Sequence, residues 1–353
     1  MKEKLKIYIG TFSTNFFSLM FDPETLEIED FHAIPDPGGR SAFFATDEEE
    51  KYLYVANEWE QGDGGVAAFK LVEDGDPVFL NALYSYGQGP AQISTMKAYG
   101  KTFVLGAGVF EGDVMVCPTA EDGSLLPFTE YIKLIDLDPT VPRCKAHGIK
   151  AIPGTHFTLV PDTLNGKIYT FELTPEGKLE KRHVFCDPLV RCPRHMTFSK
   201  DGTKLYFLTE RSNSLDVFDI NRETGEITLT YHSSTLPEDF TGKSMAAAIH
   251  RSPDGRFVYL SNRGQDSIVV YRLEDDGKKI EKVGYAEEEI AWPREFLITP
   301  DGDFLFVGNQ ELATTSIFRI NRETGIPEYT GKTFPMPFGP GPAAFITIPK
   351  TDD

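Results

Sequence analysis

Residues 192–227 read CPRHMTFSKDGTKLYFLTERSNSLDVFDINRETGEI and contain most of an antiparallel β-sheet. Three runs with apolar residues at alternate positions begin at Pro193, Lys204 and Ser214. A period of two is typical of β-strands that bury one face. Asp201-Gly202 separates the first two runs and supplies the positive backbone dihedral angle that a tight hairpin turn requires. We therefore expect consecutive short strands joined by hairpins.

The same unit recurs along the chain. Asp254-Gly255 and Asp301-Gly302 precede the runs FVYLSN and FLFVGN, and weaker copies occur towards the N-terminus. The last residues of the corresponding runs are 46 to 55 residues apart and are Thr11, Asn57, Ala107, Asp162, Glu210, Asn262 and Asn309. Seven repeats of about 50 residues, each with four strands, are typical of a seven-bladed β-propeller.

The two ends of the chain fit this pattern. The run that starts at Leu5 has no strand before it, and the apolar run 342–348 has none after it. Pairing the two would close the ring of blades and remove an exposed sheet edge. The sequence therefore predicts an all-β protein in which residues 1–353 form a single propeller domain, closed by its N- and C-terminal strands.

Composition limits the partners and the cellular location. The chain has 35 Lys and Arg against 54 Asp and Glu, a net charge of −19, which argues against nucleic acid and anionic membranes as partners. No stretch reaches the roughly 18 apolar residues of a transmembrane helix, and the N-terminus enters a strand without a signal peptide. The cysteines lack C-x-x-C spacing and are Cys117, Cys144, Cys186 and Cys192. We expect reduced thiols and a cytoplasmic protein.

Hairpin geometry predicts which side chains meet. In an antiparallel pair around a fixed turn, residues whose numbers have a constant sum face each other. This rule predicts four pairs at one strand end: Arg194 with Glu210, Arg294 with Asn309, His147 with Asp162, and Arg40 with Asn57. It also predicts that Asn262 faces Ala246, with Arg263 next along the strand.

These pairs describe a pocket at the mouth of the propeller channel. Its cationic and imidazole side chains are Arg40, His147, Arg194, His195, Arg263 and Arg294, and its acids are Glu210 and Asp162. Guanidinium groups bind carboxylate and phosphate through paired hydrogen bonds. The pocket therefore favours a small anionic substrate, although the protein as a whole is strongly negative.

Several motifs resemble those of the seven-bladed lactonases, namely the propeller-type 6-phosphogluconolactonases and the fungal carboxymuconate-lactonizing enzymes. The resemblance covers almost the whole chain and rests on PRHMTF at 193–198, SNRGQDSI at 261–268 and WPREF at 292–296. It implies ester-ring chemistry that needs no metal or other cofactor. It also implies a functional set that falls here on His147, Glu210, Arg194 and Arg263, with Arg294 as a further candidate. His147 stands in the context Lys-Ala-His-Gly, which departs from the family's usual Pro-His.

We therefore expect a hydrolase that opens the lactone ring of a small anionic sugar, with 6-phosphogluconolactone as the first candidate. Lactone opening needs a base for water, donors for the oxyanion and an anchor for the substrate's charge. We assign Glu210 as the base, with His147 as its rival, and Arg194 to the oxyanion. The expected binding residues are Arg263, Arg294, Arg40, His195, Asp162, Asn262 and Asn309. The sequence predicts that Glu210→Gln reduces turnover without changing stability. His250 is interpreted as a core histidine.

Three alternatives remain at this level. A muconate-type lactonizing enzyme would use the same cations. A calcium-dependent lactonase could use oxygen atoms of Glu210, Asp162, Asn262 and Asn309, but arginines at the same mouth disfavour a dication, so we predict no metal. The third alternative is a propeller that serves as a non-enzymatic binding platform.

Overall fold

The structure is a computed structural model and describes residues 3–59, 64–73, 75–336 and 344–348. Seven four-stranded antiparallel sheets contain its strands. Their number and strand order confirm the predicted all-β fold of seven blades. The only helices among the described residues are α1 (Leu134–Leu137) and the 3-10 helix η1 (Asp275–Gly277). Neither is long and apolar enough to cross a membrane.

The first three sheets, with strands in spatial order, have the following bounds. One sheet contains β28 (Ala344–Ile348), β1 (Leu5–Gly10), β2 (Asn15–Asp22) and β3 (Glu27–Pro35). The next contains β4 (Ser41–Thr46), β5 (Tyr52–Asn57), β6 (Gly65–Lys70) and β7 (Val78–Tyr84). The third contains β8 (Gln92–Ala98), β9 (Lys101–Gly108), β10 (Asp113–Pro118) and β11 (Glu130–Lys133).

The other four sheets follow the chain without interruption. They contain β12 (Lys150–Ala151), β13 (Phe157–Asp162), β14 (Lys167–Leu173) and β15 (Leu179–Cys186); then β16 (Pro193–Phe198), β17 (Lys204–Thr209), β18 (Ser214–Ile220) and β19 (Ile227–Ser234). The last two contain β20 (Met245–Arg251), β21 (Phe257–Arg263), β22 (Ser267–Glu274) and β23 (Lys279–Ala286); then β24 (Pro293–Ile298), β25 (Phe304–Asn309), β26 (Thr314–Ile320) and β27 (Pro327–Pro335).

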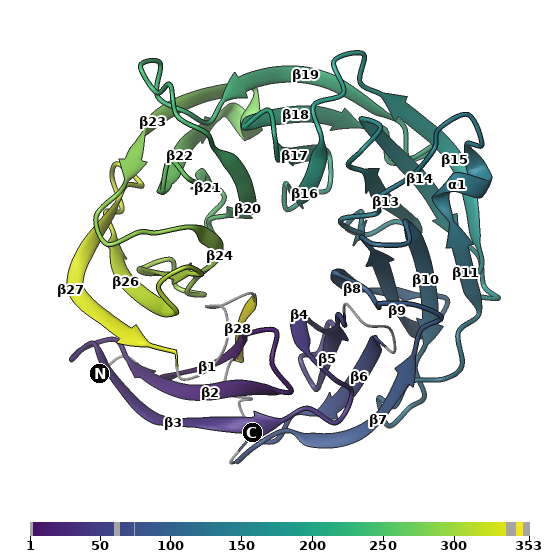
Figure 1. Ribbon diagram of the computed structural model, residues 1–353, viewed down its shortest axis with the longest axis horizontal. Helices are drawn as coiled ribbons and strands as arrows, with labels where there is room; N and C mark the ends of the chain where they lie inside the picture. The colour runs from purple at the N-terminus through teal and green to yellow at the C-terminus, as the bar shows by residue number, and fades with distance from the viewer. Residues whose placement is uncertain (1–2, 60–63, 74, 337–343, 349–353) are drawn as a thin grey trace. The chain divides into compact units, whose positions relative to one another are not determined.

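Figure 1 shows the strands of each sheet side by side in this order. The predicted second strands of the repeats end within one residue of their observed ends. Asp-Gly turns join the first two strands of the later blades, and Gly202 and Gly302 adopt φ values of 68° and 73°. Side chains other than glycine rarely adopt this left-handed conformation, so the glycines permit these tight turns.

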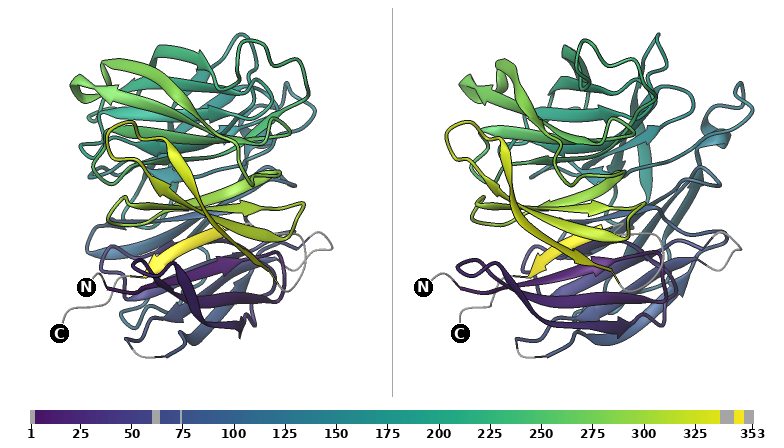
Figure 2. Two further views of the ribbon diagram at one scale, coloured as in Figure 1. Left: turned by 90° about the vertical axis from the view of Figure 1, so that its left-hand side faces the viewer. Right: turned by 60° about the vertical axis from the view of Figure 1, so that its left-hand side comes forward.

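The first and last strands of the chain share one sheet. β28 pairs antiparallel with β1, from Lys6 opposite Ile348 to Gly10 opposite Ala344. Both views of Figure 2 show the yellow C-terminal strand beside the purple N-terminal strands. The predicted pairing is confirmed for these residues, whereas Pro342 and Ala343 lie outside the described residues.

The chain divides into two compact units. The first consists of Met1–Ala151, Leu173–Glu180 and Ala343–Asp353, and the second of Ile152–Glu172 and Lys181–Pro342. The four cysteines, all within the described ranges, form no disulfide bond.

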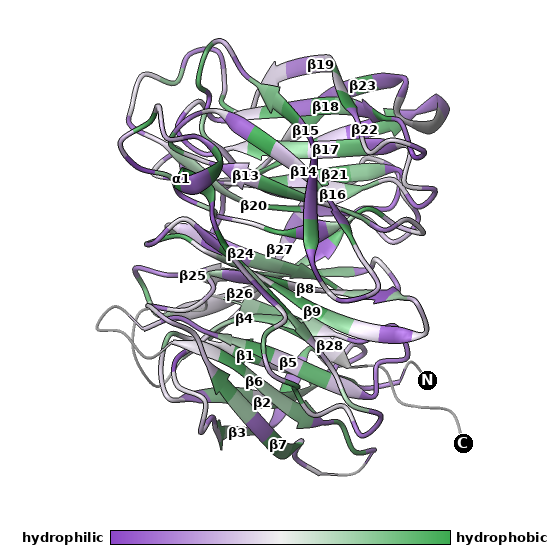
Figure 3. Ribbon diagram, turned by 90° about the vertical axis from the view of Figure 1, so that its right-hand side faces the viewer, coloured by the Kyte–Doolittle hydropathy of each residue, from purple (hydrophilic) through white to green (hydrophobic). Residues whose placement is uncertain are grey.

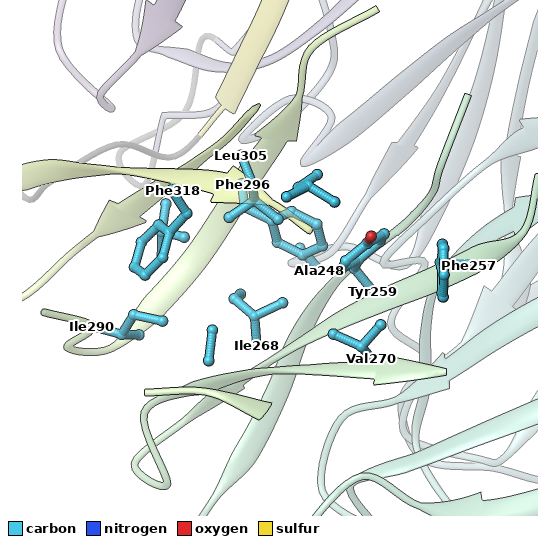
Figure 4. Packing of buried hydrophobic residues seen from close by; sticks show 12 residues of the cluster. Ala248, Phe257, Tyr259, Ile268, Val270, Ile290, Phe296, Leu305 and Phe318 are labelled. Carbon is cyan, nitrogen blue, oxygen red and sulfur yellow. The ribbon is translucent and has the colours of Figure 1, made fainter. Parts of the chain in front are cut away.

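In the second unit, neighbouring sheets pack through apolar faces. One buried cluster joins the sheet of β20–β23 to that of β24–β27 and includes Tyr259, Phe296 and Phe318 (Figure 4). Alternating apolar residues of both sheets point into it, which is why the strands have a period of two. Figure 3 shows the same pattern, with strands such as β9 and β17 largely hydrophobic and the connecting loops largely hydrophilic. This packing fixes the first and second strands of the blades, whose ends carry the site residues.

Candidate functional site

The backbone of Glu210 joins two neighbouring sheets of the second unit. Its N–H donates a hydrogen bond to the carbonyl of Cys192 at 2.8 Å, and its carbonyl accepts one from the N–H of Ala246 at 2.9 Å. Cys192 immediately precedes β16, whereas Ala246 belongs to β20 of the next sheet. The side chain of Glu210 is therefore fixed at the boundary between two blades.

The carboxylate of Glu210 lies between two guanidinium groups. Nη2 of Arg263 donates a hydrogen bond to Oε1 at 2.6 Å, and Nε of Arg194 is 3.6 Å from the same oxygen. Both guanidiniums also donate to backbone carbonyls of residues 245–247 in β20. Carbonyl contacts of this kind hold each arginine in one orientation, so the three charged groups form a rigid cluster.

The charges in this cluster are not balanced. Burial alone would raise the pKa of Glu210, but the charges of Arg194, Arg263 and Arg294 outweigh it and lower that pKa below its ordinary value. Burial, followed by the charge of Arg263, lowers the pKa of Arg194 to about 9, so this arginine, only 2% exposed, is still charged at neutral pH. Glu295 is the second carboxylate that acts on Arg194. Among the groups named here, three guanidiniums act with two carboxylates, and this set favours an anion.

Trp292 and Asp266 adjoin the cluster, and neither is among the site residues expected from the sequence. The N–H of Trp292 donates a hydrogen bond to Oδ1 of Asp266 at 2.9 Å, and the indole ring centroid is 5.8 Å from Cζ of Arg263. Trp292 has a φ of 50°, an uncommon value for a bulky residue that is often found at functional sites. Both residues lie within quoted motifs, WPREF and SNRGQDSI, and this was the signal available in the sequence.

The predicted register is wrong at two of the hairpins. Pro193, and not Arg194, pairs with the second strand there, and a bulge follows between Pro193 and His195. The same bulge follows Pro293, which pairs with Asn309 in place of Arg294. A bulge contributes one extra residue that turns away from the regular pleat. Arg194 therefore reaches Glu210 by its side chain and not by direct cross-strand pairing.

Asn262 pairs with Ala246 as predicted, but its side chain has internal partners. Its amide oxygen accepts a hydrogen bond from Thr235 Oγ1 at 2.7 Å, and its amide nitrogen donates to the carbonyl of Thr235 at 3.1 Å. Asn309 holds Glu289 and Ala291 in the same way, at 3.1 and 3.0 Å. Both asparagines are buried. They secure the loop that leads into their own blade, which leaves no exposed amide for a substrate.

Two further predicted residues lie beside turns or in the core of the second unit. Asp162 is buried at the end of β13, where its carboxylate accepts hydrogen bonds from the Leu164 N–H at 3.2 Å and from Asn165 Nδ2 at 2.6 Å. His195 is also buried, with its Nδ1 3.1 Å from Nη1 of Arg194. His195 therefore supports Arg194, as expected from their adjacency.

Arg40 and His147 belong to the first unit. Ser41, and not Arg40, pairs with Asn57, so the predicted register is wrong here as well. The guanidinium of Arg40 donates to the carbonyl of Phe12 at 2.5 Å and lies 5.8 Å from the ring centroid of Trp59. His147 is half-buried in irregular backbone, because β12 begins only at Lys150. No strand pairing of the predicted kind exists at His147.

Within the described ranges, no group of three or more His, Cys, Asp or Glu is arranged to hold a metal ion.

Known families and relatives match the chain over nearly its full length. A family model described as "Lactonase, 7-bladed beta-propeller" matches residues 6–340. A Bacillus subtilis protein named 6-phosphogluconolactonase is 30% identical over 338 residues, which cover 94% of this chain and 95% of the relative. A Yersinia pestis protein of the same name is 29% identical over 309 residues, covering 86% and 87% of the two chains.

Solved structures share the fold. The periplasmic gluconolactonase PpgL of Pseudomonas aeruginosa superimposes with a TM-score of 0.88 at 22% identity, covering 99% of this chain and all of the other. A protein from Lactobacillus plantarum gives a TM-score of 0.86 at 23% identity, with 98% and 100% coverage. At these identities the likeness establishes the fold and not the activity.

Proposed function

The chain belongs to the lactonase family of seven-bladed β-propellers, and on this basis we propose that it hydrolyses the ring ester of a small anionic sugar lactone. The observation that carries the proposal is the ion pair of Glu210 with Arg263 at 2.6 Å, with Arg194 and Arg294 as further cations around the carboxylate. A surplus of fixed guanidinium charge suits a substrate that carries one negative group and develops a second during the reaction.

The cluster offers two of the three functions that lactone opening requires. We assign Arg263, whose guanidinium donates to backbone carbonyls of β20, as the preorganised donor for the oxyanion that forms when water attacks the carbonyl carbon. Arg294 is half-buried, and thus more accessible than Arg194, so we assign it to the substrate's anionic group. Arg194 is too buried for direct contact with substrate, and we propose that it acts through Glu210 and Arg263.

Glu210 is better suited to holding these cations than to accepting a proton. A general base works best when its pKa lies near the working pH. The arginines lower the pKa of Glu210, so it is a weak base. We therefore propose that Glu210 positions Arg263 and balances its charge. His147, the other candidate for the general base, lies in the first unit, and that role for it stays a proposal.

We propose 6-phosphogluconolactone as the substrate, because two relatives near 30% identity carry that enzyme's name. A phosphate ester supplies the anionic group that Arg294 would bind through a charge-assisted contact. We also retain the cytoplasmic location that the cysteine pattern predicts, since such a sugar phosphate is an intracellular metabolite.

The test is a substrate panel read by proton exchange at constant pH, with release expected for lactone opening and uptake for lactonization. The panel contains 6-phosphogluconolactone, its unphosphorylated counterpart, a uronic lactone and a muconate dicarboxylate. We expect the highest kcat/KM for the phosphorylated lactone, above the rate of spontaneous opening. Turnover only of the muconate would replace the proposal with lactonization, and no acceleration of any lactone would refute it.

A further inference from the structure

The described part of the second unit contains an imidazole–carboxylate pair next to the arginine cluster. Nε2 of His250, on β20, is 2.7 Å from Oε1 of Glu295, on β24 of the neighbouring sheet. The side chain of Glu295 is 6% exposed, whereas that of His250 is 40% exposed. The carboxylate is thus enclosed by protein, and the imidazole it holds remains open to a small molecule. The interpretation of His250 as a core histidine is wrong.

The protein fixes the orientation of this imidazole. The ring packs edge-on against Phe296 at 4.8 Å between centroids, and Phe296 belongs to the buried cluster of Figure 4. The N–H of Phe296 donates a hydrogen bond to Glu295 Oε1 at 3.1 Å, which holds the carboxylate in turn. An ionised carboxylate only accepts hydrogen bonds, so Nε2 of His250 carries the proton. Nδ1 of the neutral ring then has the lone pair that can accept a proton.

The pair lies along the same strand as the anchors of the arginine cluster. The carbonyl of Ala247 on β20 accepts a hydrogen bond from Arg194, and His250 follows three residues later, at most about 10 Å along the strand. Glu295 directly follows Arg294 and is one of the charges that act on Arg194. Arg294 and the imidazole held by Glu295 therefore belong to the same two neighbouring strands, β20 and β24.

We propose that His250 is the general base of the lactonase reaction and that Glu295 is its positioning residue. This inference rests on the proposed function and adds the group that accepts the proton, which the cluster around Glu210 lacks. Titratable groups from the strands packed against β20 are Arg194 and His195 of β16, Lys204 and Tyr206 of β17, Tyr259 and Arg263 of β21, and Arg294 and Glu295 of β24.

The proton and the bonds balance over two steps. As the oxygen of water bonds to the lactone carbonyl carbon, Nδ1 of His250 takes a proton from it, and the carbonyl oxygen becomes an oxyanion. When the tetrahedral intermediate collapses, the bond between that carbon and the ring oxygen breaks. The imidazolium returns the proton to the leaving ring oxygen, which yields the open hydroxy acid and the neutral histidine.

The test compares His250→Asn and Glu295→Gln with a matched control, His232→Asn. His232 is also an exposed imidazole held by a buried carboxylate, with Nδ1 2.6 Å from Asp216 and 47% exposure, but it lies on the outer strand β19. We expect His250→Asn to lower kcat by ~10²–10⁴-fold and to leave KM within about threefold of wild type. We also expect this variant to lose the acid limb, that is, the fall of kcat at low pH that wild type shows. The control should retain both kcat and the limb.

Glu295→Gln provides an independent readout. We expect it to lower kcat about tenfold and to move the acid limb, because the amide no longer holds the ring through a charged acceptor. If His250→Asn does not fold, the position of the limb in Glu295→Gln decides the matter. An unchanged limb in Glu295→Gln, or a kcat within about fivefold of wild type in His250→Asn, would overturn the assignment of the base while leaving lactonase activity intact. A wild-type protein that opens no lactone would refute the proposed function as well.

Discussion

The substitution Glu210→Gln tests the role of the arginine cluster, because it keeps the size of the side chain and removes its charge. Arg194 is 2% exposed and Arg263 is 5% exposed, so their charges would then face each other in the interior with no carboxylate between them. Removing one partner of a buried ion pair costs about 3–5 kcal/mol. In a large domain each kcal/mol lowers Tm by about 2 °C, so we now expect a Tm about 6–10 °C below wild type, in place of the unchanged stability that the sequence alone suggested.

The pH dependence of this loss identifies its cause. A lowered carboxyl pKa in the folded state adds stability above the unfolded pKa of about 4.3, and this stability is lost as pH falls through the folded value. The difference in Tm between wild type and Glu210→Gln should therefore be full at pH 6–8 and shrink below about pH 4. Circular dichroism melts across this range measure it, with the exposed Glu226→Gln as control. A difference below about 1 °C at neutral pH would mean that Glu210 does not balance the arginines.

Further outcomes concern the substrate's charge, metals, salt and the chain ends. Arg294→Ala should raise KM about 10- to 100-fold for a phosphorylated lactone and leave the neutral counterpart unchanged; equal effects would exclude anion binding by Arg294. Activity should survive EDTA, because arginines surround Glu210; loss that calcium restores would favour a metal-dependent lactonase. The net charge of −19 should repel an anionic lactone at low salt. At 0.15 M salt the Debye length is about 8 Å and the repulsion is screened, so kcat/KM should rise with salt for the anionic substrate and not for a neutral one. Deleting residues 344–353 removes the partner of β1 and should cost roughly 3 kcal/mol or more in a single cooperative transition, if residues 1–353 form one domain.

The repeat architecture could be predicted because it depends on local patterns. Alternating apolar residues and Asp-Gly turns recur at similar spacing, and the observed second strands end within one residue of the predicted positions. The pairing of Leu5–Gly10 with the C-terminal strand followed from counting strands. In contrast, the contact of His250 with Glu295 joins two blades, and no hairpin rule relates residues 45 positions apart in different sheets.

The bulges explain why the predicted strand register is wrong at Arg194 and Arg294, although the side chain of Arg194 does lie next to Glu210. A constant-sum rule holds only while each strand contributes one residue per pair. The extra residue after Pro193 and after Pro293 breaks that count at the strand end where the site lies. Bulges of this kind are common beside functional sites because they redirect a side chain. Sequence periodicity cannot show them, since one inserted residue at the end of a short strand changes no apolar pattern.

The predicted alignment of the repeats is also wrong by one residue at Glu210, which was aligned with Asn262 and Asn309. Thr209, Asn262 and Asn309 each pair with the first residue of the following strand, so Glu210 corresponds to Arg263 and Gln310 and not to Asn262. Counting five residues back from Ser214, Ser267 and Thr314 would have given this alignment from the sequence.

The two neighbouring positions have different tasks because successive residues of a strand point to opposite faces. At the first position, Asn262 and Asn309 hold the loops that enter their own blades. At the second, the side chain turns towards the next blade, and Glu210 meets Arg263 from the equivalent position of that blade at 2.6 Å. The same strand end thus recurs in neighbouring blades. The ion pair forms because one blade has a glutamate at the position where the next blade has an arginine. A site of this origin needs no insertion or special loop, which is why it arises within regular repeats.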